Sequence, residues 1–140
     1  MNANKVMCGT WGEVWLGEDY VAECYGLQAK VTVNKEDVNL CRQMAVDKKI
    51  TSISCTGSLK LHKANSRMAI AIGDSIRKGE DRRFTILSKL EDPDACGAER
   101  ITLRNVSFDD LTLADWEAAK NGTVEAPFTF TDYEFIGVEA

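Results

Sequence analysis

The sequence predicts a mainly β protein of the α+β class, an antiparallel β-sandwich or small barrel of about seven strands with one flanking α-helix. Three observations carry this prediction. Apolar and polar residues alternate with a period of two in one segment after another, as in half-buried antiparallel strands. A helical period occurs once, over residues 65–78. The 140 residues, 44% of them hydrophobic, suffice for a single domain, assigned here to residues 1–140.

The first strands lie in the N-terminal third of the chain. Residues 13–16 read as a short strand, and Gly17 begins a turn that folds this strand onto the next segment. The alternation is clean over residues 27–34, with apolar side chains at the odd positions. This pattern predicts an antiparallel strand with one buried face.

Residues 35–49 interrupt the alternation with 15 residues of mixed charge. The alternation resumes over residues 53–62, so we expect an extended hairpin whose tip is a long projecting loop. Loops of this length are uncommon in compact domains and are often functional.

The predicted helix covers residues 65–78. Met68, Ile72 and Ile76 recur every four residues and form one apolar stripe, which we expect to pack on the sheet. Gly79 follows as the residue that ends the helix in a left-handed conformation.

Three further strands are predicted in the C-terminal half. They cover residues 84–90, 101–108 and 124–135, and the pattern of the second one slips by one residue near Asn105. A one-residue slip is typical of a β-bulge. We also expect a short helical turn around Trp116.

We find no residues arranged for catalysis, metal binding or cofactor binding. His62 is the only histidine, and any Ser/His/Asp or Cys/His arrangement would have to use it. It lies on the polar side of a strand, where we expect a surface or interface residue. The sequence contains no nucleotide-binding glycine loop, no HExxH motif and no CxxC pair. No segment reads as a signal peptide or a membrane span, so we expect reduced thiols in a protein made in the cytosol.

The charge is unevenly distributed. The net charge of −5 argues against tight non-specific binding to nucleic acid. Residues 34–63 sum to +3, whereas residues 101–140 sum to −6. These two segments are either complementary surfaces on neighbouring copies or two solvated faces of a monomer.

Several pieces of the chain, in a fixed order, carry a family resemblance. They are residues 12–18 (GEVWLGE), 34–44, 78–85, 97–109 and 127–133 (PFTFTDY). In order and spacing they resemble the phage tail tube proteins of the PBSX type, which occur in prophages and in R-type bacteriocins with contractile tails. The resemblance extends over residues 12–135.

The resemblance implies a structural protein, not an enzyme, that forms the inner tail tube of a contractile phage tail or R-type bacteriocin. In such tails hexameric rings stack into a hollow tube, and contraction of the sheath drives the tube through a target envelope. The implied partners are further copies of the chain, the tail sheath protein, and the baseplate and tail terminator proteins. DNA or a tape-measure protein would occupy the lumen without tight binding. The protein would be made in the bacterial cytoplasm and end in a virion tail or a released bacteriocin, with no membrane anchor.

The loop over residues 35–49 is then the candidate for contacts between subunits or rings. Its basic charge could meet acidic positions in residues 101–140 of another copy. The candidate contact residues are Lys35, Glu36, Asp37, Val38, Asn39, Leu40, Arg42, Met44, Lys48 and Lys49. Multiplied around a ring, the acidic net charge also favours an acidic bore.

Two other functions remain open at this stage. One is a tube subunit of a type VI secretion system, which would share the architecture in a different biological setting. The other is a monomeric ligand-binding β-barrel, with Trp11, Trp15 and Trp116 lining a cavity.

Overall fold

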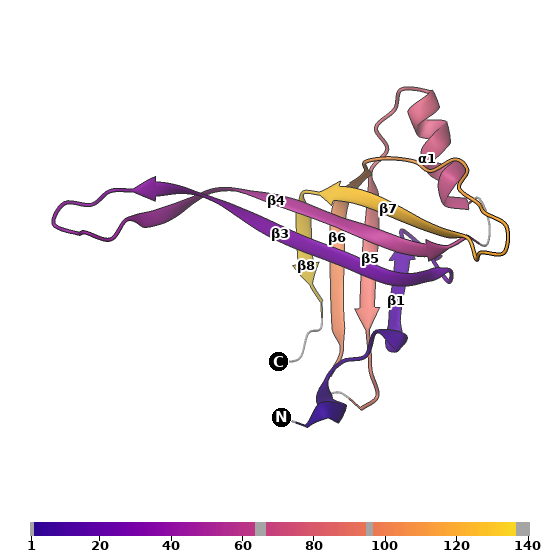
Figure 1. Ribbon diagram of the computed structural model, residues 1–140, viewed down its shortest axis with the longest axis horizontal. Coiled ribbons are helices and arrows are strands. Elements are labelled where there is room, and N and C mark those ends of the chain that lie inside the picture. The colour runs from indigo at the N-terminus through magenta and orange to yellow at the C-terminus, as the bar shows by residue number, and fades with distance from the viewer. Residues whose placement is uncertain (1, 64–66, 95–96, 137–140) are drawn as a thin grey trace.

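The computed structural model describes residues 2–63, 67–94 and 97–136 (Figure 1). Among these, the predicted class is confirmed: the chain is mostly antiparallel β-sheet with one short helix. Eight strands are present instead of about seven, and the shortest, β2, has two residues. The elements are two 3-10 turns (Ala3–Lys5, Gly9–Trp11), β1 (Gly12–Leu16), β2 (Asp19–Tyr20), β3 (Cys24–Val38), β4 (Asp47–His62), α1 (Arg67–Arg77), β5 (Phe84–Leu90), β6 (Glu99–Phe108), β7 (Thr123–Phe130) and β8 (Asp132–Phe135).

One continuous sheet folds over itself into two layers. Its strand order is β2-β1-β5-β6-β7-β4-β3, and β8 pairs with β6. The first layer holds β1, β2, β5, β8 and most of β6, and the second holds β7, β4 and β3. Figure 1 shows the strands of the second layer crossing those of the first. The last residues of β6, Ser107 and Phe108, pair with β7 and join the layers.

The core lies between the two layers. Ile86 and Val106 from the first layer and Leu59 and Phe128 from the second are fully buried. The Phe128 ring packs directly over Gly57 on the adjacent strand β4. A Cβ at that position would lie 2.6 Å from Cζ of Phe128 and 2.3 Å from the backbone oxygen of Gln28, so only glycine fits there.

The corner between the layers is built around Asn105. In the β5–β6 pair, Phe84 faces Val106 and Ile86 faces Leu103, so β6 carries one extra residue. Asn105 has a φ of 59°, the left-handed conformation that asparagine tolerates better than most residues. The predicted β-bulge near Asn105 is therefore confirmed.

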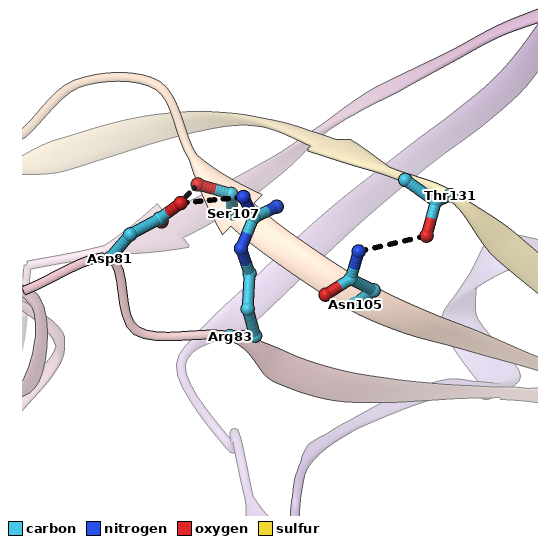
Figure 2. A network of polar contacts seen from close by, with 5 residues as sticks. All are labelled: Asp81, Arg83, Asn105, Ser107 and Thr131. Carbon is cyan, nitrogen blue, oxygen red and sulfur yellow. Dashed lines mark hydrogen bonds and ion pairs between the residues drawn. The ribbon is translucent and has the colours of Figure 1, made fainter.

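The chain passes from β7 to β8 beside this bulge, at Thr131. The side-chain amide of Asn105 donates to the Thr131 hydroxyl oxygen (Figure 2). The Thr131 backbone N–H donates to the carbonyl of Arg104. On the same side of the bulge, Asp81 accepts hydrogen bonds from Arg83 and Ser107. These contacts tie together the places where the chain changes layer.

The helix ends as predicted but packs differently. Gly79 has a φ of 73°, and the backbone N–H of Glu80 donates to the carbonyl of Ser75 over 2.8 Å. Ile72 and Ser75 form the buried side, whereas Ile76 is 54% exposed and lines a hollow with Phe84 of β5 and Phe108 of β6. Ile76 therefore lies at the edge of the contact between the helix and the sheet. Ile76 lies about 100° further around the helix than Ser75, so only part of its side chain faces the sheet.

Two other expectations concern the start of the helix and the segment around Trp116. The side chain of Met68 and residues 65 and 66 lie outside the described part of the structure. The helical turn expected around Trp116 within residues 113–121 is not formed. The chain makes one isolated turn there, in which the Lys120 backbone N–H donates to the carbonyl of Glu117 and Ala119 has a φ of 64°, and Trp116 is 84% exposed. No surface of the described chain covers this side chain enough to hold a helical turn against it.

Candidate assembly surfaces

A long hairpin arm projects from the body of the protein. β3 and β4 pair along their whole length, but β7 covers β4 only over residues 55–62. Residues 31–54, called the arm below, therefore extend beyond the two-layered body (Figure 1). The expectation of a loop over residues 35–49 is corrected at both ends, because strand structure continues to Val38 and resumes at Asp47. Oppositely charged side chains face each other across this part of the strands, a pattern that a search for apolar alternation misses.

The structure distributes the predicted contact residues over both strands and the turn of the arm. Glu36 faces Lys49 across the strands, and Asp37 faces Lys48 with an Oδ1–Nζ distance of 3.9 Å. Both members of the second pair are well exposed, so it contributes only about 0–1 kcal/mol. Lys35, Glu36, Asp37 and Val38 belong to β3, Asn39, Leu40, Arg42 and Met44 to the turn, and Lys48 and Lys49 to β4.

The arm is less basic than the sequence segment suggested. Residues 31–54 hold four cationic and three anionic side chains, a net charge of +1. The rest of the +3 over residues 34–63 comes from Lys60 at the end of β4 and Lys63 just beyond it. Charge is therefore not the main surface feature of the arm.

One face of the arm is apolar and uncovered. Val33 faces Ile53 across the strands, and these two residues share a face with the buried Cys55. Ile53 is 49% exposed and Ile50, further out, is 57% exposed. The apolar face of the core thus continues along the arm without a second layer over it. The predicted alternation over residues 27–34 is present, but from Ala29 onward its apolar side is not buried within the chain.

The tip of the arm adds further apolar surface. Leu40 and Val46 are about half exposed, and the side chain of Met44 is fully exposed. Arg42 adopts a left-handed conformation with a φ of 63° between them. Contiguous exposed apolar surface of this kind marks interaction sites in soluble proteins.

A second uncovered apolar area lies on β8. Tyr133 and Phe135 face Leu103 and Ile101 of β6, so all four side chains point to the core side of the first layer. Phe135 is nevertheless 62% exposed, because the second layer does not extend over it. The two rings lie 6.1 Å apart in an edge-to-face arrangement.

Strand edges are also free. β3 ends the strand order, so its 15 residues have no partner strand on their outer side within the described chain. The inner side of β4 is open over residues 47–54 for the same reason. Unpaired strand edges offer rows of backbone donors and acceptors to another chain.

The residues considered for catalysis do not converge on a site. The His62 ring packs against Tyr25 at 4.4 Å on an exposed surface. Within residues 2–63, 67–94 and 97–136, no group of three or more metal-ligating side chains is present. The helix that is described is too short to cross a membrane.

The three tryptophans do not line a cavity. Trp11 and Trp116 are exposed, and the Trp15 ring lies between Tyr20 and the ammonium of Lys89 on the outside of the first layer. A hollow between α1 and β7 holds about 40 Å³, far below the volume of a typical ligand site. A larger one, of about 450 Å³, lies beside α1 and is lined mainly by polar and charged side chains.

Uncovered apolar surface and free strand edges of this kind are typical of proteins that assemble with other chains. The chain belongs to the phage tail tube protein family, because the model of that family matches residues 1–137. It is 29% identical over 136 residues to the phage-like element PBSX protein XkdM of Bacillus subtilis, a match that covers 96% of this chain and 92% of that protein. The resemblance to tail tube proteins of the PBSX type is thereby confirmed.

Solved structures of contractile injection systems share the fold. The chain matches a subunit of the sheath-tube complex of the extracellular contractile injection system PVC, in its extended state, with a TM-score of 0.76. That match has 10% identity and covers 97% of this chain and 95% of the other. A subunit of the sheath/tube terminator of the same system matches with a TM-score of 0.72 and 10% identity, over 90% and 93% of the two chains. The protein is a subunit of a tail tube.

Proposed function

We propose that this tail tube subunit forms hexameric rings, which stack into the hollow inner tube of a contractile phage tail or R-type bacteriocin. The observation that carries this proposal is the arm, whose apolar face continues the core but has no cover within the chain. Burying apolar surface contributes roughly 25 cal/mol per Å², so covering Val33, Ile50 and Ile53 favours association.

The contact is made with another copy of the same chain. Arm and body are different surfaces, so a contact between the arm of one copy and the body of the next is heterologous. Such contacts close into rings or continue into helical filaments, depending on the rotation between copies. A stacked tube combines the two outcomes.

The predicted contact residues of the arm keep their role in this proposal, with an altered balance of forces. Apolar side chains such as Leu40 and Met44 supply most of the contact. Lys48 and Lys49 add electrostatic complementarity to acidic positions in residues 101–140 of a neighbouring copy.

The further partners are those of a contractile tail. Outside the tube lies the tail sheath protein, and at its ends lie the baseplate and tail terminator proteins. DNA or a tape-measure protein passes through the lumen without tight binding. The chain has a structural and not an enzymatic role, and it is made in the bacterial cytoplasm before assembly.

One pair of variants tests the proposal. Ile53→Asp places a carboxylate on the apolar face of the arm, and Ser54→Asp places the same group on the opposite face of the same strand. Both side chains are exposed in the single chain, so both variants should fold with an unchanged circular dichroism spectrum and melting temperature. Negative-stain microscopy should show tubes for Ser54→Asp and the parent protein, but none for Ile53→Asp. Tubes of normal length formed by Ile53→Asp would contradict the proposal.

A further inference from the structure

A small apolar hollow lies at the end of the second layer that is farthest from the arm. β4 runs from Asp47 in the arm to His62, and the hollow lies where β4 ends. Its apolar wall contains Leu61 of β4, Ile72 of α1 and Ala126 of β7. Figure 1 shows this end of β4 beside α1, with the arm at the opposite end of the long axis of the molecule. An arm therefore cannot reach the hollow of its own chain.

The rim of the hollow is acidic. Glu23, Asp110 and Glu125 line it, and Lys63 also contributes. The described lining residues therefore carry a net negative charge. With about 40 Å³, the hollow is too small for a ligand of ordinary size, but it has room for the end of one side chain.

The tip of the arm has the complementary properties. Met44 is fully exposed there, and methionine is unbranched and flexible, so it fits irregular apolar gaps. Residues 39–49 hold the three cations Arg42, Lys48 and Lys49 and one anionic side chain, a net charge of +2. The tip thus presents an apolar side chain among cations, whereas the hollow presents an apolar recess among carboxylates.

We propose that Met44 of one copy inserts into this hollow of the next copy, an inference that rests on the proposed function. A copy displaced along the direction of β3 and β4 brings its arm tip to the far end of the second layer of another copy. Each such contact leaves a free tip at one end and a free hollow at the other, so the assembly can keep growing. Burial of the Met44 side chain stabilises the contact, and the opposite charges around it orient the arm.

Cross-linking between copies tests the contact. The background protein carries serine in place of Cys8, Cys41 and Cys96, and is treated in parallel as the baseline. Met44→Cys is introduced into it together with Ala69→Cys, at a position of α1 that lines the hollow. Assembled tubes are treated with a short bis-maleimide, and the products are separated on a denaturing gel. Each chain then has one thiol on either side of the contact, so linked copies should form a ladder of dimers, trimers and longer chains.

The matched control pairs Met44→Cys with Thr85→Cys, an exposed position on β5, in place of Ala69→Cys. Tubes of this control pair and of each single variant should give the baseline pattern. Should Met44→Cys weaken assembly, the native Cys41 is retained as the thiol of the tip, because it is also exposed in the turn. Tubes of the test pair that give no ladder, or the same ladder as the control pair, would overturn this contact and leave the proposed function intact. Failure of the parent protein to form tubes would instead overturn the proposed function.

The length of the inserted side chain gives a second measure. Met44→Ala removes the group that enters the hollow, whereas Gln43→Ala shortens a neighbouring exposed side chain to the same size. Met44→Ala should raise the subunit concentration needed for tube formation by about tenfold, and Gln43→Ala should leave it unchanged. Equal effects of the two variants would contradict the insertion of Met44.

Discussion

The side-chain amide of Asn105 donates a hydrogen bond of 2.9 Å to the hydroxyl oxygen of Thr131, and this bond joins the two places where the chain turns from one layer to the other. β6 bends at the bulge that contains Asn105, and the passage from β7 to β8 bends at Thr131. Because the second layer carries the arm, the angle between the layers decides where the arm points. We therefore expect changes at this corner to affect assembly, although it lies in the body of the protein.

The first prediction concerns this corner. Asn105→Ala removes the hydrogen bond and places a residue with a Cβ in a left-handed conformation, so we expect a loss of about 1–2 kcal/mol in the free energy of unfolding. Asn105→Gly removes the same bond but accepts a φ of 59° without strain, and should lose less. Urea denaturation of both variants measures the difference. Equal losses for alanine and glycine would mean that the backbone conformation at Asn105 is not a source of strain.

The second prediction concerns the contact between Gly57 and Phe128 in the core. Gly57→Ala should lower the free energy of unfolding by about 3 kcal/mol or more, because the new methyl group would overlap both the Phe128 ring and a rigid backbone oxygen. Gly9→Ala is the control, since nothing lies within 4 Å of its Cβ position. Thermal melting of the two variants tests this. In Gly57→Ala/Phe128→Leu, the smaller leucine side chain removes the clash with the ring but not the clash with the backbone oxygen of Gln28, so the free energy of unfolding should recover only in part. Full recovery would show that the clash with the Gln28 backbone is unimportant.

Local patterns explain what could be predicted from the sequence. The bulge at Asn105 and the helix end at Gly79 depend on neighbouring residues alone, and both were predictable. The burial of the alternating strands was not, because it depends on what lies above each strand. Val33 and Leu27 both stand on the apolar side of the same alternating strand. Because the second layer extends past the first, the core covers part of Leu27 but leaves Val33 exposed.

The same limit applies to the arm and the helix. Charged residues such as Lys48 and Asp37 break the apolar alternation by which a strand is recognised in a sequence. Their opposite charges nevertheless suit a cross-strand pair. Ile76 matches a four-residue apolar stripe, yet it stays 54% exposed at the edge of the contact with the sheet, while Ser75 is buried. One feature of the sequence does indicate the exposed face. Apolar alternation continues at Val33 and Ile53, on both sides of the charged segment, and these strands are too long for a core of this size to bury their full length.

The third prediction concerns the charges of the arm. Lys48→Glu/Lys49→Glu should impair tube formation while the monomer stays folded, because it removes the cations that would face acidic residues of a neighbouring copy. The reversal also sets like charges against Glu36 and Asp37 across the strands. The matched control is therefore the exchanged pair Glu36→Lys/Lys49→Glu, which keeps an opposite-charge pair across the strands but moves the cation to the other strand.

Tube length by negative-stain microscopy, at low and high salt, separates the two explanations. If the cations contact a neighbouring copy, the exchanged pair should also give short or few tubes, and raising the salt concentration should weaken assembly of the parent protein. Normal tubes from the exchanged pair would show that only pairing within the arm matters. Normal tubes from the double reversal would show that the assembly contact does not depend on electrostatic attraction to Lys48 and Lys49.

The fourth prediction concerns Cys8, whose thiol lies 3.3 Å from the hydroxyl of Thr10. Hydrogen bonding from the side chain and backbone of Thr10 lowers the pKa of the Cys8 thiol, whereas burial raises the pKa of Cys24. A lower pKa means more thiolate at a given pH, so Cys8 should react with iodoacetamide at a lower pH than an ordinary thiol, and Cys24 only at a higher pH. Thr10→Val keeps the shape of the side chain, removes the hydroxyl, and should move the pH profile of Cys8 upward. Mass spectrometry of peptides alkylated across a pH series measures both profiles. An unchanged profile in Thr10→Val would show that the hydroxyl does not stabilise the thiolate.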